Sequence, residues 1–276
     1  MHLLLDIGGT KLRIAFSKDG KRFAGKPVIA NTPENFKTGM ALIKKAVAGR
    51  PGIKSAICGI AGSFDRNKTK LVSSPNLPGW IGKPIKAELG NITGAPVRLE
   101  NDADLAGLGE AVFGAGKKDR IVAYLTISTG VGGTRIVDKK IDAGVFGFEP
   151  GQQIIDLSKW KPGAPSRSGT LEKFISGADM EKKYGKRPAD IKSRSAWEEK
   201  ARLLAVGLYN TARFWSPDII ILGGSMITKK VGIPLSRVKY HFGKKPSVFS
   251  KTLKLTKAKL GEYSGLYGAM ALLKQK

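Results

Sequence analysis

Two glycine-rich turns in this sequence repeat the same short pattern. Gly8-Gly9-Thr10-Lys11 follows an apolar segment at 3–7, and Gly132-Gly133-Thr134-Arg135 follows another at 121–127. In each case a second strand-like segment comes directly after the turn. Glycine hairpins are common individually, so the argument depends on the pair and on the motifs around it. The repeat indicates two related halves, each of which presents a glycine turn to a ligand.

Strand-like and helix-like segments alternate along the chain, which predicts an α/β fold. The expected strands are 3–7, 12–17, 56–61, 121–127, 133–137 and 218–222. The expected helices are 34–48, 103–113, 171–176 onward, 196–215 and 264–274. A capping box of Ser195 and Glu198 is expected to open the helix at 196–215. The segments 156–170 and 181–194 are predicted loops.

Composition excludes several classes of protein. The 276 residues are 41% hydrophobic, enough to fill the core of one large domain or two ordinary ones. The one cysteine, Cys58, excludes an intramolecular disulfide, and with two histidines the chain lacks the ligands of a Cys/His zinc site. The sequence contains neither a long apolar run nor a secretory signal. We therefore expect a cytoplasmic protein with no membrane partner and no structural zinc.

The net charge of +26 is unusual, and such a charge often accompanies nucleic-acid binding. Its distribution argues against that partner. Residues 1–114 carry 17 Lys/Arg against 9 Asp/Glu, and residues 115–276 carry 31 against 13, so both halves are basic. The lysines are spread among apolar residues, without the aromatic interleaving of a base-stacking groove. The charge is therefore interpreted as a solvated basic surface.

The glycine turns are suited to binding phosphate, because glycine exposes backbone N–H groups without an obstructing side chain. The first turn offers Gly8, Gly9, Thr10 and Lys11, and the second offers Ser128, Thr129, Gly130, Gly132 and Gly133. Neither turn matches a P-loop or a dinucleotide-binding fingerprint. Asp6, at the end of the first strand, is suited to holding Mg²⁺ through water, since that cation prefers oxygen ligands.

A carboxylate at a strand-to-helix junction has two readings. Asn101-Asp102 follows a strand that is expected to end at Leu99 and precedes a helix expected to begin near Ala103. Asp102 could cap that helix. It could equally act as a general base, with Asn101 hydrogen-bonded to a hydroxylated ligand.

Four further polar or glycine-bearing sites complete the candidates. Asn76 lies between prolines in "SSPNLPGW", where it is either a ligand contact or a turn residue. Glu149 and Glu172 are surface or capping carboxylates if taken singly, but with Asn101 and Asp102 they are the kind of polar set that binds sugar hydroxyls. Gly223-Gly224 ends the strand "IIILGG" and would let a flat ring approach the backbone.

In their order, these motifs resemble those of the ROK family of sugar kinases and repressors, within the actin-like ATPase superfamily. "DIGGTK", "ENDADLAGLGE", "LTISTGVGG" and "IIILGGS" are similar to its first phosphate loop, catalytic segment, second phosphate loop and adenosine motif. The resemblance implies two RNase-H-like α/β domains with an interdomain cleft. A smaller domain would comprise 1–114 with the last helix, 263–276, and a larger one 115–262. A homodimer is also implied.

The resemblance implies an ATP-dependent hexose kinase, with glucose as the expected acceptor. Asp102 would be the catalytic base, and Asp6 would face the Mg²⁺ ion. The sugar would be held by Asn76, Asn101, Asp102, Glu149, Gln152 and Glu172. ATP would be held by Gly8, Gly9, Thr10, Lys11, Thr129, Gly130, Gly132, Gly133, Gly223 and Gly224.

The chain departs from the family pattern beside the sugar motif. It reads Phe148-Glu149-Pro150-Gly151-Gln152, so Gln152 stands where many members have a histidine that contacts sugar and zinc. The three cysteines of that zinc site are missing, and Thr170 stands before the Leu-Glu pair. A zinc-free variant is implied, with its loop at 152–170 ordered by packing around Trp160 or by sugar binding.

Three alternatives remain open. The sugar could be an N-acetylhexosamine or fructose. The protein could be a sugar-responsive repressor, although the first phosphate strand begins at residue 3 and leaves no room for a preceding helix-turn-helix. It could also be a non-catalytic ROK protein that binds sugar or nucleic acid. Against that last reading, Asp6, Asp102 and both glycine turns are all present.

Overall fold

The computed structural model describes residues 1–50, 52–142, 144, 147–161, 163, 167–244 and 252–275. The chain forms two compact units. Unit 1 comprises Met1–Val112 and Tyr263–Lys276, and unit 2 comprises Phe113–Glu262.

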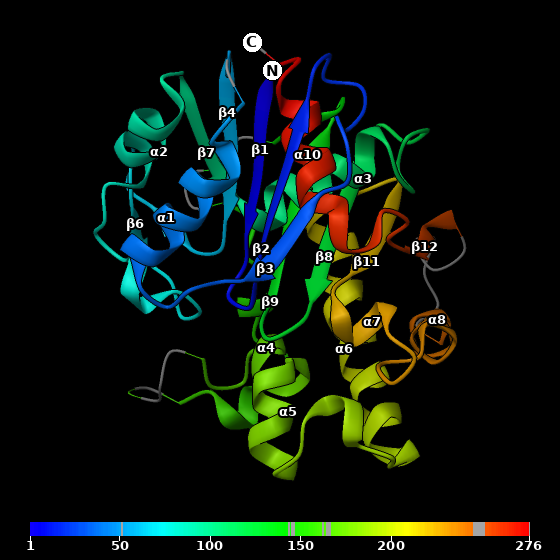
Figure 1. Ribbon diagram of the computed structural model, residues 1–276. Helices are drawn as coiled ribbons and strands as arrows, with labels where there is room; N and C mark the ends of the chain where they lie inside the picture. The colour runs from blue at the N-terminus through cyan, green and yellow to red at the C-terminus, as the bar shows by residue number, and fades with distance from the viewer. Residues whose placement is uncertain are drawn as a thin grey trace. The chain divides into compact units, whose positions relative to one another are not determined.

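Unit 1 is built on a five-stranded sheet in the order β3-β2-β1-β4-β7 (Figure 1). The strands are β1 (His2–Ile7), β2 (Lys11–Ser17), β3 (Val28–Asn31), β4 (Ser55–Ile60) and β7 (Val97–Asn101). The first three are antiparallel neighbours, and β4 and β7 continue the sheet in parallel with β1. The remaining strands, β5 (Ser63–Phe64) and β6 (Leu71–Ser73), form a separate two-stranded sheet.

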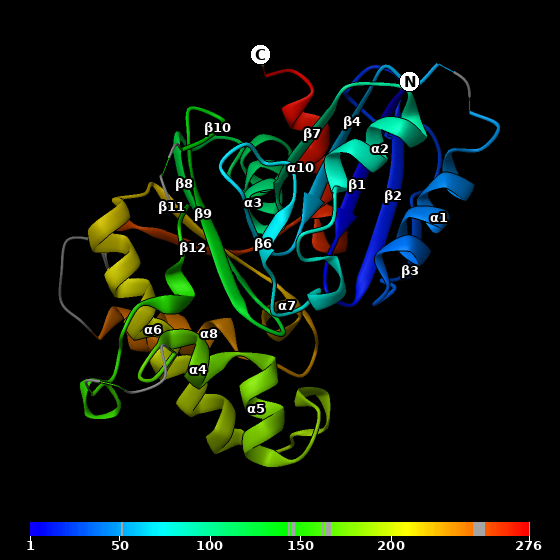
Figure 2. The ribbon, with the colours of Figure 1, turned by 90° about the vertical axis from the view of Figure 1, so that its left-hand side faces the viewer.

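Helices cover both faces of this sheet, which explains why β1 is almost continuously apolar (Figures 1 and 2). One face carries α1 (Phe36–Val47) and α2 (Ile85–Thr93), and the other carries α3 (Asp102–Val112) and α10 (Ser264–Leu272). Leu3, Leu5 and Ile7 pack in the same core as α1 and α2. Because side chains alternate along a strand, Asp6 belongs to the α3 and α10 face.

Helices α3 and α10 pack closely enough to require glycine at their contact. A Cβ atom on Gly268 would lie 1.7 Å from the backbone oxygen of Leu105, and one on Gly109 would lie 2.3 Å from that of Ser264. Ser264 Oγ donates a hydrogen bond of 3.1 Å to the buried Glu110. The C-terminal helix is thereby fixed against the helix that Asp102 begins.

The segment between β6 and α2 is anchored by Trp80, which is fully buried within the 3-10 turn η1 (Pro78–Trp80). Its indole nitrogen donates to the carbonyl oxygen of Pro33 at 2.9 Å. A Cβ atom on Gly39 of α1 would lie 2.4 Å from the same ring. These contacts fix the end of the loop that carries Asn76.

Unit 2 repeats the strand arrangement of unit 1, with the order β10-β9-β8-β11-β12. Its strands are β8 (Ile121–Ile127), β9 (Val131–Val137), β10 (Lys140–Ile141), β11 (Ile219–Gly223) and β12 (Lys254–Lys257). An antiparallel hairpin, β8-β9, has a parallel neighbour, β11, beside its first strand, as β1-β2 has β4. The two related halves are confirmed, but the position of the second turn is wrong. Gly132–Arg135 lies within β9, and the turn between β8 and β9 is formed by residues 128–130.

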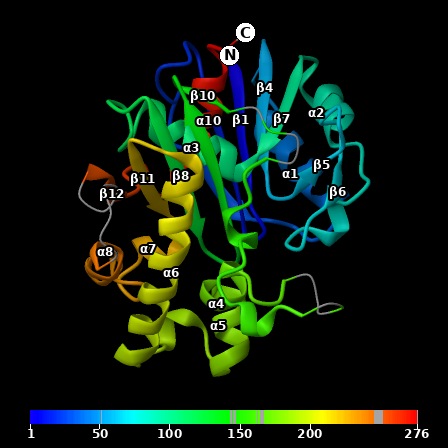
Figure 3. The ribbon, with the colours of Figure 1, turned by 180° about the vertical axis from the view of Figure 1, so that it is seen from behind.

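The core of unit 2 lies between this sheet and its helices (Figure 3). The helices are α4 (Leu171–Ile175), α5 (Gly177–Tyr184), α6 (Arg194–Trp215), α7 (Ser225–Thr228) and α8 (Leu235–Gly243). Short 3-10 turns are η2 (Pro150–Gln152), η3 (Leu157–Lys159), η4 (Pro188–Asp190) and η5 (Gly261–Tyr263). Helix α8 is tied to α6 where Arg237 and His241 both contact Glu198.

The six predicted strands and five predicted helical regions are present, and the α/β class is confirmed. The capping box is wrong, because Ser193 caps α6 by accepting from Ala196 N at 3.2 Å. The predicted loop at 181–194 is also wrong in part, since α5 continues to Tyr184. Trp160 is 52% exposed, and residues 162 and 164–166 of its loop lie outside the described residues, so its role in ordering the loop stays a prediction.

The sequence pattern did not predict α8 and β12, which lie in charged segments, or α2 and β3, which are short.

Among the described residues, no helix combines the length and apolar character that crossing a membrane requires.

We expect Gly268→Ala to destabilise the protein, because the added methyl would meet the Leu105 backbone. Overpacking of this kind costs about 1–3 kcal/mol. Urea unfolding would measure the change. Gly90→Ala in α2 is the matched control, because a Cβ atom there meets nothing within 4 Å and alanine is the better helix former. Equal stability of the two variants would contradict the close α3–α10 contact.

Candidate active site

The first glycine turn is a tight hairpin that places Asn76 beside it. Gly8 N donates to Lys11 O at 3.0 Å, and Thr32 Oγ1 supports the turn by donating to Gly8 O at 2.7 Å. A Cβ atom on Gly9 would fall 2.5 Å from Asn76 Cβ. Glycine is therefore required at position 9 for this approach, which brings a predicted sugar residue against a predicted phosphate turn.

Asp6 is a buried carboxylate next to that turn, and its partner is fixed by the hairpin register. Asp6 lies opposite Arg13 across β1 and β2, and Arg13 Nη1 donates to its carboxylate at 3.2 Å. Gly265, at the start of α10, leaves room for the group, since a Cβ atom there would lie 2.8 Å from Asp6 Cγ. Burial raises the pKa of Asp6 to about 6, although the Arg13 charge acts in the opposite direction.

Asp102 is the first residue of α3, but it does not serve as the helix cap. Asn101 Oδ1 accepts from Ala103 N at 2.8 Å and from Asp104 N at 3.2 Å, which is the capping arrangement. Asn101 Nδ2 donates to Gly62 O at 3.1 Å. Asn101 is thus occupied by its own backbone surroundings.

The Asp102 carboxyl has an acidity suited to proton transfer near neutral pH. Burial raises its pKa to about 7, and the negative charge of Asp6 adds to the increase. A backbone hydrogen bond from Ala103 N, at 2.9 Å, acts in the opposite direction. The two carboxylates therefore influence one another, and a cation beside them would relieve their repulsion.

The second glycine turn is held by backbone hydrogen bonds from α5. Gly177 N donates to Ser128 O at 2.7 Å, and Ala178 N donates to Thr129 O at 3.2 Å. Gly130 O accepts from Ser128 N at 2.9 Å, which closes the turn. The position of the turn therefore depends on the start of α5.

The glycines at the end of β11, Gly223 within the strand and Gly224 after it, lie beside β8, the strand that leads to this turn. Gly223 pairs with Thr126 of β8, and Gly224 has a φ of 84° with its Cβ position 2.2 Å from Ile127 O. Ser225 Oγ lies 3.2 Å from Ser128 Oγ. A pocket of about 390 Å³ is lined mainly by residues that come after Gly224 in the chain, and Lys229, Lys230 and Lys257 are among them.

Glu172 is buried against the second glycine turn. Its Oε2 accepts from Val131 N at 2.7 Å, and a Cβ atom on Gly130 would lie 2.7 Å from the same oxygen. Its Oε1 accepts from Gln152 Nε2 at 3.1 Å and from Arg167 Nη2. The structure thus brings together two predicted sugar residues, Gln152 and Glu172, and joins them to the phosphate turn.

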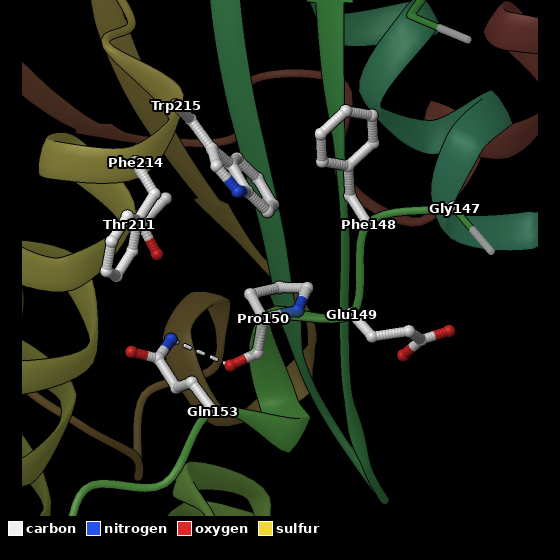
Figure 4. Close-up of a pocket in the computed structure, with 8 residues that line it drawn as sticks. All are labelled: Gly147, Phe148, Glu149, Pro150, Gln153, Thr211, Phe214 and Trp215. Carbon is white, nitrogen blue, oxygen red and sulfur yellow. Dashed lines mark hydrogen bonds between the residues drawn. The ribbon is translucent and has the colours of Figure 1, made fainter. Parts of the chain in front are cut away.

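Glu149 lies in the same segment but points elsewhere. Figure 4 shows its carboxylate directed away from Phe214 and Trp215, which line a pocket of about 210 Å³ on the other side of the backbone. The rings of Phe148 and Trp215 meet edge to face with centroids 5.0 Å apart. Glu149 is also among the residues that line this pocket, although its carboxylate points away from the two aromatic side chains.

The donor groups that are present limit which metal ions could bind. The residues described contain no group of three or more His, Cys, Asp or Glu side chains placed to hold a metal ion. The groups that contact Glu172 Oε1 are the Gln152 amide and the Arg167 guanidinium, which are not ligands that zinc prefers. Asp6, whose negative charge acts on Asp102, has the oxygen donors that fit a magnesium ion held through water.

Sequence reasoning missed Arg13 and Arg167. Arg13 had a readable signal, because a hairpin closed between residues 8 and 11 places residues 6 and 13 opposite one another. No local pattern pointed to Arg167.

Comparison with known proteins gives relatives over nearly the whole chain. The sequence is 29% identical to the N-acetyl-D-glucosamine kinase of Vibrio vulnificus, covering 99% of both chains. It is 25% identical to the glucokinase of Streptomyces coelicolor, covering 98% of this chain and 96% of that one. The structure matches a ROK hexokinase from Thermus thermophilus with a TM-score of 0.80 and 26% identity, over 98% and 96% of the two chains.

The fold is therefore that of the actin-like ROK proteins, with two α/β units. Residues 3–276 match the ROK family as a whole, so the protein whose glycine turns and carboxylates are described above belongs to the ROK family.

Proposed function

We propose that this protein is an ATP-dependent sugar kinase that transfers the γ-phosphate of MgATP to a hexose hydroxyl, with glucose as the first acceptor to test. The observation that carries the proposal is Asp102, a carboxyl with a pKa of about 7 whose capping role is taken over by Asn101. Related glucokinases and N-acetylglucosamine kinases of the same family support the reaction class.

Asp102 would accept the proton of the sugar hydroxyl as that oxygen attacks the γ-phosphorus and the bond to ADP breaks. A carboxyl with a pKa near neutrality is partly ionised at working pH and yet basic enough to take the proton. Asp6 would hold Mg²⁺ through water, and the ion would supply charge neutralisation at the phosphates. Arg13 would keep Asp6 oriented.

The glycine turns would bind the phosphates through their N–H groups and hydroxyls. In unit 1 the candidates are Gly8, Gly9, Thr10 and Lys11, and in unit 2 they are Thr129, Gly130, Gly132 and Gly133. The hydrogen bonds that hold both turns support this role, because donors that are positioned before transfer need little rearrangement during it. Gly223 and Gly224 would lie on the adenosine side.

The acceptor would be oriented by Asn76, Asn101, Glu149, Gln152 and Glu172. An N-acetylhexosamine is an equally supported acceptor, because an N-acetyl-D-glucosamine kinase matches this chain over its whole length. A homodimer and a cytoplasmic location are further parts of the proposal, and nucleic acid is not a proposed partner.

We expect ADP release with MgATP to depend on one or a few sugars in a panel of glucose, mannose, fructose, N-acetylglucosamine and N-acetylmannosamine. Asp102→Asn should lower kcat by about 10²–10⁴-fold, because the amide cannot accept the proton. Absence of turnover with every sugar, in a folded protein that binds ATP, would contradict the kinase proposal.

The Asp102→Asn variant should remain folded, which separates lost chemistry from lost structure. The raised pKa means that the folded protein binds this proton more tightly than the unfolded chain between about pH 4 and 7. Stability is therefore lost as pH rises through that window. The variant does not ionise, so its thermal midpoint at pH 8 should equal or exceed that of the wild type, with a smaller difference at pH 4.

The rate should follow the ionisation of the same group. We expect kcat/KM for the sugar to rise about tenfold per pH unit in acid and to level off above about pH 7, because only the ionised Asp102 can accept a proton. Initial rates measured across this range would give the profile. A flat profile between about pH 5 and 8 would exclude Asp102 as the base.

A further inference from the structure

Arg167 lies between two carboxylates of unit 2. Its Nη2 donates to Glu172 Oε1 and also lies 4.0 Å from Asp179 Oδ2. The side chain is half-buried, whereas both carboxylates are nearly inaccessible to solvent. Ion pairs with partners screened from water in this way contribute more than fully exposed pairs do.

Each carboxylate belongs to an element that holds the second glycine turn. Glu172 accepts directly from Val131 N at 2.7 Å. Asp179 lies in the first turn of α5, where its carboxylate accepts from Ser176 Oγ at 2.9 Å. That same turn of helix supplies the N–H groups that bind Ser128 O and Thr129 O. One guanidinium therefore joins both supports of the turn.

The Arg167 backbone is fixed as well. Its carbonyl oxygen accepts from Thr170 Oγ1 at 2.8 Å, and Thr170 caps α4 and pairs with Ile154 across the base of the loop. The arginine thus reaches Glu172 from a backbone position that the loop itself determines. Gln152, at the other end of that loop, donates to the same Oε1 atom at 3.1 Å.

We propose that Arg167 is a positioning residue that couples the sugar side of unit 2 to its phosphate turn. This inference rests on the proposed function, since it assumes that Gln152 and Glu172 contact the sugar. A sugar hydroxyl bound by either residue changes the hydrogen bonding of the Glu172 carboxylate, which also accepts from Val131 N. Arg167 limits the movement of that carboxylate, so sugar binding tightens the turn instead of displacing it.

The coupling has a thermodynamic signature that activity alone would not show. If sugar binding orders the phosphate turn, it raises the affinity for nucleotide, and nucleotide raises the affinity for sugar by the same factor. Coupling of this kind is commonly at least about fivefold. Arg167→Ala removes the guanidinium that contacts both carboxylates. It leaves the backbone bond from Ser176 N to Glu172 O at 3.0 Å, the Lys173–Asp179 pair at 2.6 Å and the backbone bonds of the turn in place.

The test is calorimetric titration with Mg²⁺ and the non-hydrolysable ATP analogue AMPPNP, without sugar and with saturating glucose or N-acetylglucosamine. The wild type should bind AMPPNP about fivefold or more tightly with sugar present. Arg167→Ala should bind AMPPNP with nearly the same affinity in both conditions. Arg167→Lys should restore part of the ratio, because it keeps the charge but loses the planar fork.

Arg187→Ala is the matched control, because Arg187 makes an exposed ion pair with Asp190 elsewhere in unit 2. It should keep the wild-type ratio. Thermal unfolding of each variant checks folding, and Arg167→Gln replaces the alanine variant if that one unfolds.

An unchanged ratio in Arg167→Ala, or a ratio of one in the wild type, would overturn the proposal. Failure of the kinase proposal is seen separately, as absence of sugar-dependent ADP release.

Discussion

The buried carboxylate of Asp6 constrains the elements packed around it in unit 1. Asp6 lies at the end of β1, inside the layer formed by the sheet and α10, where burial opposes its ionisation. The hairpin supplies Arg13 directly across from it, and Gly265 removes the side chain that would otherwise collide with it. Together β1, β2 and α10 accommodate the Asp6 carboxylate. Its negative charge in turn raises the pKa of Asp102.

The same hairpin occurs twice, but its two copies are stabilised differently. In unit 1 the turn at residues 8–11 is held by a short internal bond and by Thr32. In unit 2 the turn at residues 128–131 is held from outside, by the start of α5 and by the Glu172 carboxylate. A turn held by a separate element can respond to whatever moves that element, whereas a self-contained hairpin is rigid. The difference explains why coupling to a ligand is argued for the second turn.

Glu172 shows how a residue can serve binding and architecture together. Both of its oxygens already accept hydrogen bonds from the protein, so a bound sugar would add to an existing network. Buried charges are tolerated where partners satisfy them. Here those partners are the Gln152 amide and the Arg167 guanidinium.

The sequence by itself determined the elements whose pattern is local. Its glycine turns, apolar strands and the long helix at 194–215 follow from periodicity and turn chemistry, and the order of its motifs indicated the family. The register of the first hairpin, and with it the Asp6–Arg13 pair, was also within reach. At the starts of α3 and α6 the sequence offers two nearby cap residues each, and the structure shows that Asn101 and Ser193 are the ones used. Only the tertiary structure decided that Arg167 and Gln152 meet Glu172. Glu172 and Val131 are 41 residues apart in the chain, and contacts over such separations depend on how helices pack on sheets. Local patterns do not contain that information.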